Sequence, residues 1–394
     1  MTGPSNPDPR RSRAVRITPT GASLVAGIVV AWVAGAALGY PALVVAAGGG
    51  AMAVLTAIVF VCWRPRVRVG REFSPSTVTA GETAAAVVEV TNLSRLRSPP
   101  VTVVDGVGNQ DVELGVRALS ADRSALVRYP LPTVRRGRVP LGPLRIVRSD
   151  PFGVLRRLQD HGGGDVLWVH APRHRMAPLP SGVIMDLEGP VSDTLAEGSV
   201  SFSALREYVP GDDRRQIHWR STARLGTLMV RQHIDTNEPR ATVVLDARAL
   251  LWPAESFEEG VSLAASVAHS VSDQGHRVTL RIVGEDLAAS RALGAVTIDD
   301  RLAAAQTVQR SSFQSLFSVI EAAPAGGALI LVTGRMEPVV EARLAAQGRR
   351  FSPVAVCSVV ADRQASWRRR SGVRLICGPD AATTAGAWNT MVRS

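Results

Sequence analysis

Two long apolar stretches near the start of the chain constrain its fold more than any other feature. Residues 22–40, ASLVAGIVVAWVAGAALGY, and residues 42–63 contain no charged side chain. Each is about as long as a helix that crosses a bilayer. The short Gly39-Tyr40-Pro41 segment between them leaves room only for a tight turn. The sequence therefore predicts a two-helix transmembrane hairpin over residues 22–63.

Arginines flank this hairpin on both outer sides. Because positively charged flanks are retained in the cytoplasm, both ends of the hairpin and the rest of the chain are predicted to be cytoplasmic, with the hairpin in the membrane. A cleaved signal peptide is the alternative for the first stretch, although the second stretch would still anchor the product. The flanking arginines are Arg10, Arg11, Arg13 and Arg16 before the hairpin and Arg64, Arg66, Arg68 and Arg71 after it.

The basic composition excludes several chemistries. All 45 cationic side chains are arginine, since the sequence contains no lysine, and the formal net charge is +11. Walker A loops, kinase-type phosphate lysines and Schiff-base chemistry are therefore excluded. Cys62, Cys357 and Cys377 lack the spacing of a zinc site or a disulfide framework. We expect no cofactor, and the charge favours a generic basic surface over a dedicated polyanion site.

The pattern of apolar and polar residues after the hairpin changes near residue 240. Residues 64–157 contain short alternating runs such as VTVVDGV and SALVRYPLP between turn residues, which predicts a small antiparallel β-sandwich. Residues 240–394 alternate apolar runs with helical segments at 255–274, 313–323, 337–348 and 381–392, which predicts an open α/β sheet with parallel strands. Ligands of such sheets bind beyond the carboxyl ends of strands, here near Asp246, Gly284-Glu285 and Thr333-Gly334.

A dense group of charged and aromatic residues lies in the connecting segment, residues 158–239. The stretch LREYVPGDDRRQIHWRSTARLGTLMVRQH resembles the signature of the bacterial domain of unknown function 58 family, and RRGRVPLGPLRIVRSDPFG resembles an element found upstream in that family. The resemblance covers most of the chain from about residue 22 to about residue 290. Its signature and docking residues are Arg206, Glu207, Tyr208, Pro210, Gly211, Asp212, Asp213, Arg215, Ile217, His218, Trp219, Ala223 and Arg224.

The resemblance implies a membrane-anchored protein with a von Willebrand factor A-like α/β region near its C-terminus. It also implies a link with MoxR-type AAA ATPases and sometimes with transglutaminase-like membrane proteins. A working von Willebrand factor A site needs Asp-x-Ser-x-Ser to bind Mg²⁺ through oxygen atoms. This chain has Arg248 and Leu250 in the two hydroxyl positions after Asp246. We therefore expect a degenerate site without a metal.

The signature segment admits three interpretations. Val209-Pro210-Gly211-Asp212 is a turn sequence, Asp213 is expected to begin a helical turn and GTLMVRQHI reads as a strand, so arginines that bind Glu207 or Asp212 would form a structural clasp. Exposed Arg and Trp side chains would instead make a docking face. Asp212, Asp213 and His218 would in the third case support metal-assisted hydrolysis of an anionic substrate, although their spacing matches no established motif.

The sequence thus predicts a basic flexible N-terminus (1–21), the hairpin (22–63), a β-sandwich (64–157), the linking segment (158–239) and a degenerate von Willebrand factor A-like domain (240–394). The expected function is non-enzymatic: a membrane-tethered adaptor for a MoxR-type AAA ATPase, in protein-complex assembly or at the cell envelope. The alternatives are the hydrolase and a polyanion-binding membrane protein. The Arg368–Arg370 run is expected to be a solvated loop and not a nucleic-acid patch.

Overall fold

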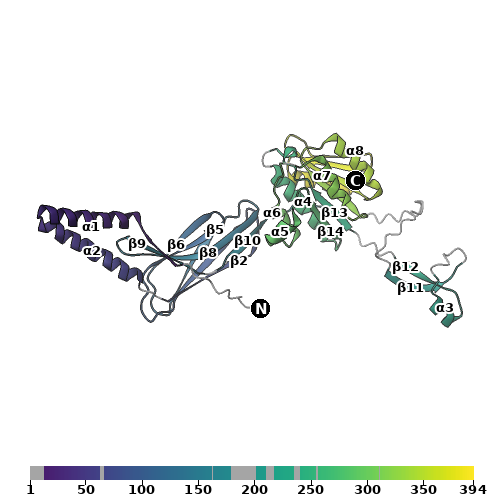
Figure 1. Cartoon of the computed structure of the whole chain (residues 1–394). Helices are drawn as coiled ribbons and strands as arrows, with labels where there is room; N and C mark the ends of the chain where they lie inside the picture. The colour runs from purple at the N-terminus through teal and green to yellow at the C-terminus, as the bar shows by residue number, and fades with distance from the viewer. Residues whose placement is uncertain are drawn as a thin grey trace. The chain divides into compact units, whose positions relative to one another are not determined.

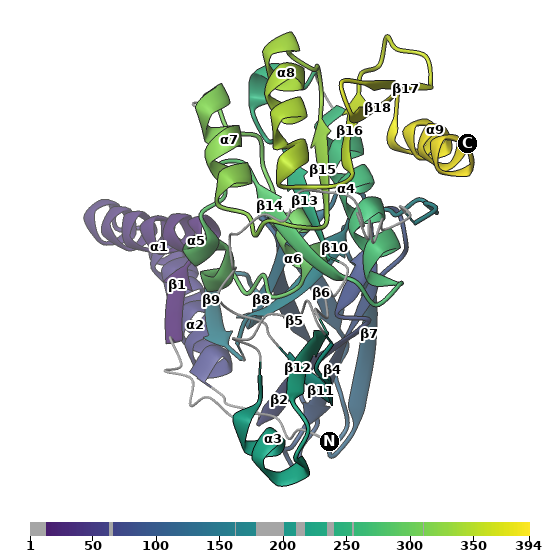
Figure 2. The same cartoon turned by 90° about the vertical axis from the view of Figure 1, so that its right-hand side faces the viewer.

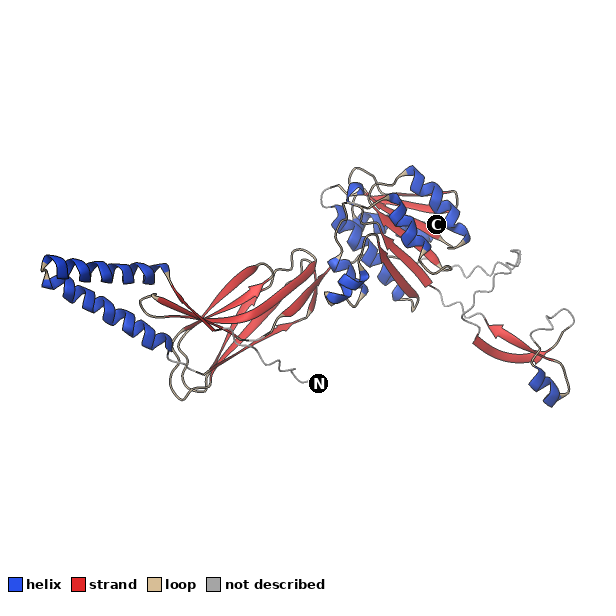
Figure 3. Cartoon of the chain, viewed as in Figure 1, coloured by secondary structure: helices blue, strands red, loops and turns tan. Residues whose placement is uncertain are grey.

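The computed structural model describes residues 13–62, 66–161, 163–178, 201–209, 217–234, 240–253, 256–309 and 311–394, with only the backbone described at 13–14, 201–206 and 231–234. The chain divides into two compact units. The first comprises residues 1–172 with 287–304, and the second comprises 173–286 with 305–394. Strands dominate the first unit after its two apolar helices, whereas strands and helices alternate in much of the second (Figures 1 and 3).

The two predicted apolar helices are confirmed. Helix α1 spans Pro19–Leu38 and α2 spans Pro41–Cys62, and both are long and apolar enough to cross a membrane. Between them, Gly39 ends α1 with φ of 67°, a left-handed conformation that glycine adopts without strain. At the other end, the Thr18 hydroxyl accepts a hydrogen bond from the Gly21 amide at 3.0 Å and caps α1. The Thr18 amide also donates to the carbonyl of Val154 at 3.0 Å, which joins the start of α1 to a turn of the following sheet.

The strands of the first unit form two sheets with a common hydrophobic core. One sheet has three antiparallel strands in the order β2-β4-β7. The other has seven strands: five follow the order β1-β9-β8-β10-β3, β5 also pairs with β8, and β6 pairs with β5. Every second residue of β4 is buried, as expected for a strand with one face on a core. Side chains from both sheets, including Val88 of β4, Val103 of β5 and Leu141 of β8, pack in this core. The strands are β1 Arg13–Ile17, β2 Val67–Ser74, β3 Thr77–Thr79, β4 Ala85–Asn92, β5 Val101–Val107, β6 Gln110–Val116, β7 Ser124–Pro130, β8 Gly137–Ser149, β9 Leu155–Asp160 and β10 Asp165–His170.

A buried polar cluster links the two sheets. The Arg71 guanidinium on β2 donates to Asp105 Oδ1 on β5 at 2.7 Å and to Asp165 Oδ2 on β10 at 2.5 Å. The Tyr129 hydroxyl on β7 donates to the other oxygen of Asp105. Burial, and then the hydrogen bond to Asp105, raise the pKa of Tyr129 well above its usual value. The charge of Asp105 is therefore compensated inside the core.

Two short helices also belong to the first unit although they lie within the predicted α/β region. Helices α5 (Leu287–Ala292) and α6 (Ile298–Ala304) fall in the 287–304 segment, and α6 lies against β8 and β10. Asp300 Oδ2 accepts the Thr297 amide at 3.0 Å, and the Thr297 hydroxyl accepts the Asp300 amide at 3.1 Å, so the two residues cap α6 reciprocally. His170 Nε2 lies 2.9 Å from Asp300 Oδ1 and ties α6 to β10.

The second unit is built on a six-stranded sheet in the order β14-β13-β15-β16-β18-β17. All neighbouring strands are parallel except the edge pair β17–β18. The strands are β13 Arg240–Leu245, β14 Arg277–Ile282, β15 Ala328–Thr333, β16 Val354–Val359, β17 Ser366–Arg370 and β18 Val373–Gly378. The four predicted helical segments appear as α4 Ser256–Ser272, α7 Phe313–Glu321, α8 Pro338–Ala346 and α9 Ala381–Arg393, and short 3₁₀ turns lie at η2 Ala249–Leu251 and η3 Gln347–Arg349.

Helices cover both faces of this sheet, as Figure 2 shows for α4, α7 and α8. Leu316, Phe317 and Leu344 of α7 and α8 pack with Leu329 and Val356 of the central strands in one core. Helices α4 and α9 contact each other and the sheet strands. The wholly buried β15 is apolar along its length, as expected for a strand covered on both sides.

Two further sequence-based expectations differ from this fold. Residues 13–17, placed in the basic N-terminal segment, form β1 and pair with β9. The Arg368–Arg370 run is not a loop, because it forms part of β17 and pairs with β18 in register. Its side chains are exposed, as expected, but the hydrogen-bonding edge of β18 makes the backbone extended.

Candidate functional site

The signature segment is organised around one short strand. Strand β11 (Ser201–Glu207) pairs antiparallel with β12 (Met229–Ile234), which places Arg206 opposite Val230 and Glu207 opposite Met229. From the other end of the signature, Ile217 forms a bridge with the same Val230, and the His218 amide donates to the Met229 carbonyl at 2.8 Å. The two halves of the signature are therefore held together by backbone hydrogen bonds to Met229 and Val230.

A short helix follows the bridge. Helix α3 (Trp219–Leu225) is capped by His218, whose Nδ1 accepts the Ser221 amide at 3.3 Å and lies 2.8 Å from the Ser221 hydroxyl. The Thr222 hydroxyl accepts the Met229 amide at 3.0 Å, which fixes the helix against β12. Since Nδ1 of His218 serves as the cap, its observed role is structural.

Helix α3 presents apolar and cationic side chains to solvent. Trp219 is 67% exposed and Leu225 is 61% exposed, and Leu228 in the next turn is also exposed. Arg220 and Arg224 are exposed beside them and lie one helical turn apart. We call these residues, Trp219, Arg220, Arg224, Leu225 and Leu228, the α3 face. The structural-clasp interpretation would place the Trp219 side chain at the edge of a core, and this is wrong because the side chain is mostly exposed.

The central part of the signature lies outside the described residues. Pro210, Gly211, Asp212, Asp213 and Arg215 belong to that part, and so does Arg214. The expected helical turn beginning at Asp213 therefore remains a prediction, and the described helix begins at Trp219. The structure brings the backbones of Arg206, Glu207, Ile217 and His218 together on β12. Whether arginines bind the aspartates stays a prediction.

A second charged cluster lies where the sheet of the second unit would bind a ligand. The parallel strands run in the order 2-1-3-4-5, and the switch point of that order falls between β13 and β15. Asp246 directly follows β13 and is almost fully buried, with 1% of its surface exposed. Arg248 Nε and Nη2 donate to its two carboxylate oxygens at 2.9 and 2.7 Å, and Arg248 Nη1 donates to Glu337 at 3.0 Å.

In this cluster the Arg248 guanidinium supplies the positive charge beside the carboxylate of Asp246. Burial lowers the pKa of Arg248, but hydrogen bonds and charge from Asp246 and Glu337 outweigh that and raise it. The Thr333 hydroxyl adds a long hydrogen bond to Asp246 at 3.4 Å, and the indole of Trp252 donates to the Asp246 carbonyl at 2.6 Å. Both carboxylate oxygens of Asp246 thus already have a cationic partner within the chain. Sequence reasoning missed Glu337, whose only signal was an acidic residue shortly after Thr333-Gly334.

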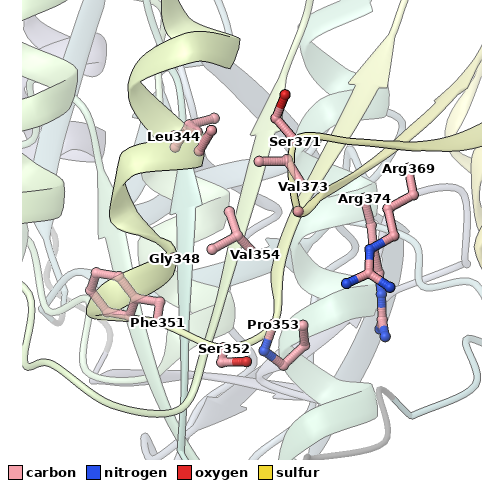
Figure 4. Close-up of a pocket in the computed structure, with 12 residues that line it drawn as sticks. Leu344, Gly348, Phe351, Ser352, Pro353, Val354, Arg369, Ser371, Val373 and Arg374 are labelled. Atoms are coloured by element: carbon pink, nitrogen blue, oxygen red, sulfur yellow. The ribbon is translucent and has the colours of Figure 1, made fainter. Parts of the chain in front are cut away.

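A pocket of about 440 Å³ lies at the opposite end of the same sheet, where β16 and β18 begin (Figure 4). Leu344, Phe351 and Val354 line its apolar part. Arg369 of β17 lies directly opposite Arg374 of β18 in the strand register, and their side chains lie side by side in Figure 4. Burial, and then the charge of Arg369, lower the pKa of Arg374. This arginine pair was also missed, although RRRSGVR reads as two arginine-bearing strands around a Ser-Gly turn.

Comparison with known families shows which family the signature segment resembles. Residues 204–297 match the family described as Protein of unknown function DUF58. The signature region is therefore similar to the DUF58 family over these residues. The resemblance inferred from the residues around β11, α3 and β12 is therefore confirmed for this part of the chain.

Individual relatives add little on function. The chain is 25% identical over 165 residues to the uncharacterized protein YeaD of Bacillus subtilis (strain 168), a match that covers 42% of this chain and 40% of that protein. The CARDB domain of a Pyrococcus furiosus protein matches 27% of the chain and 93% of its own length at 14% identity, with a TM-score of 0.21. The C-terminal domain of wzt matches 27% of the chain and 75% of its own length at 12% identity, with a TM-score of 0.22. These TM-scores are too low to support an argument about fold or function.

Proposed function

We propose that this DUF58-containing chain is a membrane-tethered, non-enzymatic adaptor that docks a MoxR-type AAA ATPase through its α3 face. The observation that carries the proposal is the exposure of Trp219 and Leu225 on a helix of seven residues. An isolated helix of this length is marginal in water, and large apolar side chains on it gain stability only when a partner covers them. Tryptophan and arginine are also the residue types that dominate binding energies at protein interfaces.

The charge of the α3 face defines the partner surface. Arg220 and Arg224 are exposed beside Trp219, so the partner should present acidic groups around an apolar pocket for the indole. The identity of the partner as a MoxR-type ATPase rests on the family resemblance. A transglutaminase-like membrane protein is a further candidate partner on the same ground.

The Asp246–Arg248–Glu337 cluster supports a non-catalytic role for the second unit. In sheets of this kind the crevice at the switch point is the usual ligand site. Here the Arg248 guanidinium occupies it through three hydrogen bonds. We assign this unit as a von Willebrand factor A-like domain that has exchanged a metal site for an internal ion pair, and the two sheets of the first unit as a β-sandwich.

The proposal places α1 and α2 across the plasma membrane as a hairpin, with both soluble units in the cytoplasm. Two features support it: the hydropathy of the two helices and the arginines that flank them in the sequence. Positively charged flanks favour retention on the cytoplasmic side. The soluble units would then stand on the side of the membrane where an AAA ATPase has access to ATP.

The test is recovery of the ATPase with the full-length chain from bacterial membranes in the presence of a non-hydrolysable ATP analogue. The chain should co-purify with a MoxR-type ATPase, and Trp219→Ala should abolish the recovery. Trp367→Ala is the matched control, because Trp367 is a partly exposed tryptophan on the β17 edge. Repeated failure to recover any AAA ATPase, or equal recovery with both variants, would contradict the proposal.

The hydrolase alternative depends on Asp212 and Asp213, which lie outside the described residues, and on His218. The His218 Nδ1 cap on α3 favours a structural role for that histidine. The discriminating measurement is the metal content of the purified chain together with Asp212→Asn. Bound metal at one equivalent per chain and loss of a measurable turnover in a folded Asp212→Asn variant would favour the enzyme over the adaptor.

A further inference from the structure

A cavity of about 650 Å³ lies in the first unit where α1 begins. Its lining comes from the β1–α1 junction and from the open face of the seven-stranded sheet, with Arg16, Thr20, Arg145, Arg156, Asp111 and Glu113 among the polar residues. The junction is held to the sheet by Thr18, whose amide and hydroxyl both donate to the 153–154 turn. The cavity is therefore built into the fold at the level where the apolar part of α1 starts.

The charges around this cavity favour an anion. Arg16 of β1 and Arg156 of β9 are directly opposite each other in the antiparallel register, and both side chains are exposed. Like charges in that position destabilise a strand pair unless a counter-charge lies between them. Arg145 is already paired with Asp111 at 2.6 Å. Among the described residues Glu113 is then the remaining acid of the lining, so one positive charge is left over.

A second, apolar cavity adjoins the first. A groove of about 400 Å³ runs between α1 and α2, and it is lined by Leu24, Gly27, Ile28 and Ala47 together with Thr20. Thr20 lines both cavities. A cavity with one excess positive charge and an apolar groove along two helices long enough to cross a bilayer therefore meet at Thr20.

We propose that the two cavities together bind one anionic phospholipid, with its phosphate between Arg16 and Arg156 and one acyl chain in the groove between α1 and α2. A soluble phosphate would satisfy the arginines but would leave the groove empty, whereas a lipid fills both. The inference rests on the membrane insertion of the proposed function but not on the ATPase partner. Occupancy of the site would fix the first unit at the surface of an anionic leaflet.

The first experiment measures lipid retention. The full-length chain is inserted in nanodiscs of equal phosphatidylglycerol and phosphatidylcholine, released in a neutral detergent and weighed by native mass spectrometry. Wild-type chain should keep phosphatidylglycerol in preference to phosphatidylcholine. The Arg16→Gln/Arg156→Gln variant should lose affinity for phosphatidylglycerol about 30-fold, at roughly fivefold per arginine near an anionic surface.

A matched control separates the site from net charge. Arg68 and Arg128 are exposed on β2 and β7 of the three-stranded sheet, so Arg68→Gln/Arg128→Gln makes the same change in charge away from the cavity. This control should retain phosphatidylglycerol as the wild type does. Equal retention by the two double variants would overturn the proposal.

The second pair of variants tests the groove without changing any charge. An added side chain at Gly27 or at Gly48 would meet no atom within 4 Å, but of these two glycines only Gly27 lines the groove among the described residues. Gly27→Trp should therefore reduce retention of phosphatidylglycerol, and Gly48→Trp should not. Unchanged retention in Gly27→Trp would contradict an acyl chain in the groove.

The remaining outcomes distinguish a lipid from a soluble phosphate, and the lipid site from the adaptor function. If glycerol 3-phosphate binds the wild-type chain as tightly as phosphatidylglycerol, the ligand is a soluble phosphate and the lipid proposal is wrong. If the chain does not enter nanodiscs, membrane insertion fails and the lipid site fails with it. If insertion and lipid retention are normal but no ATPase is recovered, the adaptor function fails while the lipid site stands.

Discussion

Replacement of Arg248 by methionine should be the most damaging single change in the second unit. Arg248 supplies both hydrogen bonds that neutralise the carboxylate of Asp246, which is 1% exposed. Methionine fills a similar volume but carries no charge, so it leaves Asp246 as an uncompensated buried anion. Breaking a buried ion pair in this way costs about 3–5 kcal/mol.

The assay is hydrogen–deuterium exchange of the β13 and β15 amides in the full-length chain. A loss of about 3–5 kcal/mol corresponds to exchange that is roughly 100-fold to a few thousand-fold faster. The double variant Asp246→Asn/Arg248→Met should recover much of this loss, because it leaves no buried charge. Arg335→Met is the control, since Arg335 is exposed in the loop after β15, and it should change little.

Two results would refute this reasoning. Equal exchange in Arg248→Met and Arg335→Met would mean that the ion pair does not stabilise β13 and β15. A double variant as unstable as Arg248→Met would mean that the cost comes from lost packing around the guanidinium and not from the buried charge of Asp246.

Three further predictions concern the first unit and the membrane topology. Burial raises the pKa of Asp300, but the hydrogen bonds with His170 and Thr297 outweigh burial and hold the pKa below its usual value. The α6 region should therefore lose stability as the pH falls below about 4, where the Asp300 carboxylate takes up a proton. Asp300→Asn should flatten this dependence in exchange measurements of α6, and an unchanged slope would contradict it. Tyr129→Phe should destabilise the two sheets by about 1–2 kcal/mol in urea, since Asp105 then loses one buried hydrogen-bond donor, and a change within error would refute that link. In a chain whose Cys62, Cys357 and Cys377 are replaced by serine, an impermeant maleimide should label Tyr40→Cys at the hairpin turn in intact cells. It should label Ser394→Cys only after permeabilisation, and the reverse pattern would contradict the proposed orientation.

Much of this fold is predictable from local pattern. The two apolar helices begin and end within three residues of the predicted limits, because an uncharged run of that length fits few other structures. The four helical segments of the second unit were likewise predicted, because they alternate with short apolar runs. Strand β17 was not, because SWRRR has no alternation. Its extended form comes from pairing with β18, a tertiary effect that a local pattern does not contain.

Long-range packing explains the other differences. Helices α5 and α6 lie in sequence inside the predicted α/β region, yet they cluster with the first unit. Ala295 and Ala303 there pack around Trp168 of β10, more than a hundred residues earlier in the chain. No spacing rule connects such segments.

In the signature too, residue spacing predicted the local structure but not the strand pairing. Its residue spacing sufficed to identify the DUF58 segment and to predict strand β12, since GTLMVRQHI is a β-rich run. The pairing of Arg206 and Ile217 with one residue, Val230, depends on strand register and was not visible in the sequence. Arg248 was noted as an odd residue after Asp246, but its second carboxylate partner, Glu337, is supplied by a distant loop.

The most direct test of the adaptor account is the affinity of a purified MoxR-type ATPase, loaded with a non-hydrolysable ATP analogue, for the full-length chain in nanodiscs. If the α3 face is the docking site, Trp219→Ala should weaken binding about 30-fold or more, as expected for an interface residue worth at least about 2 kcal/mol, while Trp367→Ala should bind as the wild type does. No measurable binding by the wild-type chain, or the same affinity for both variants, would contradict the account.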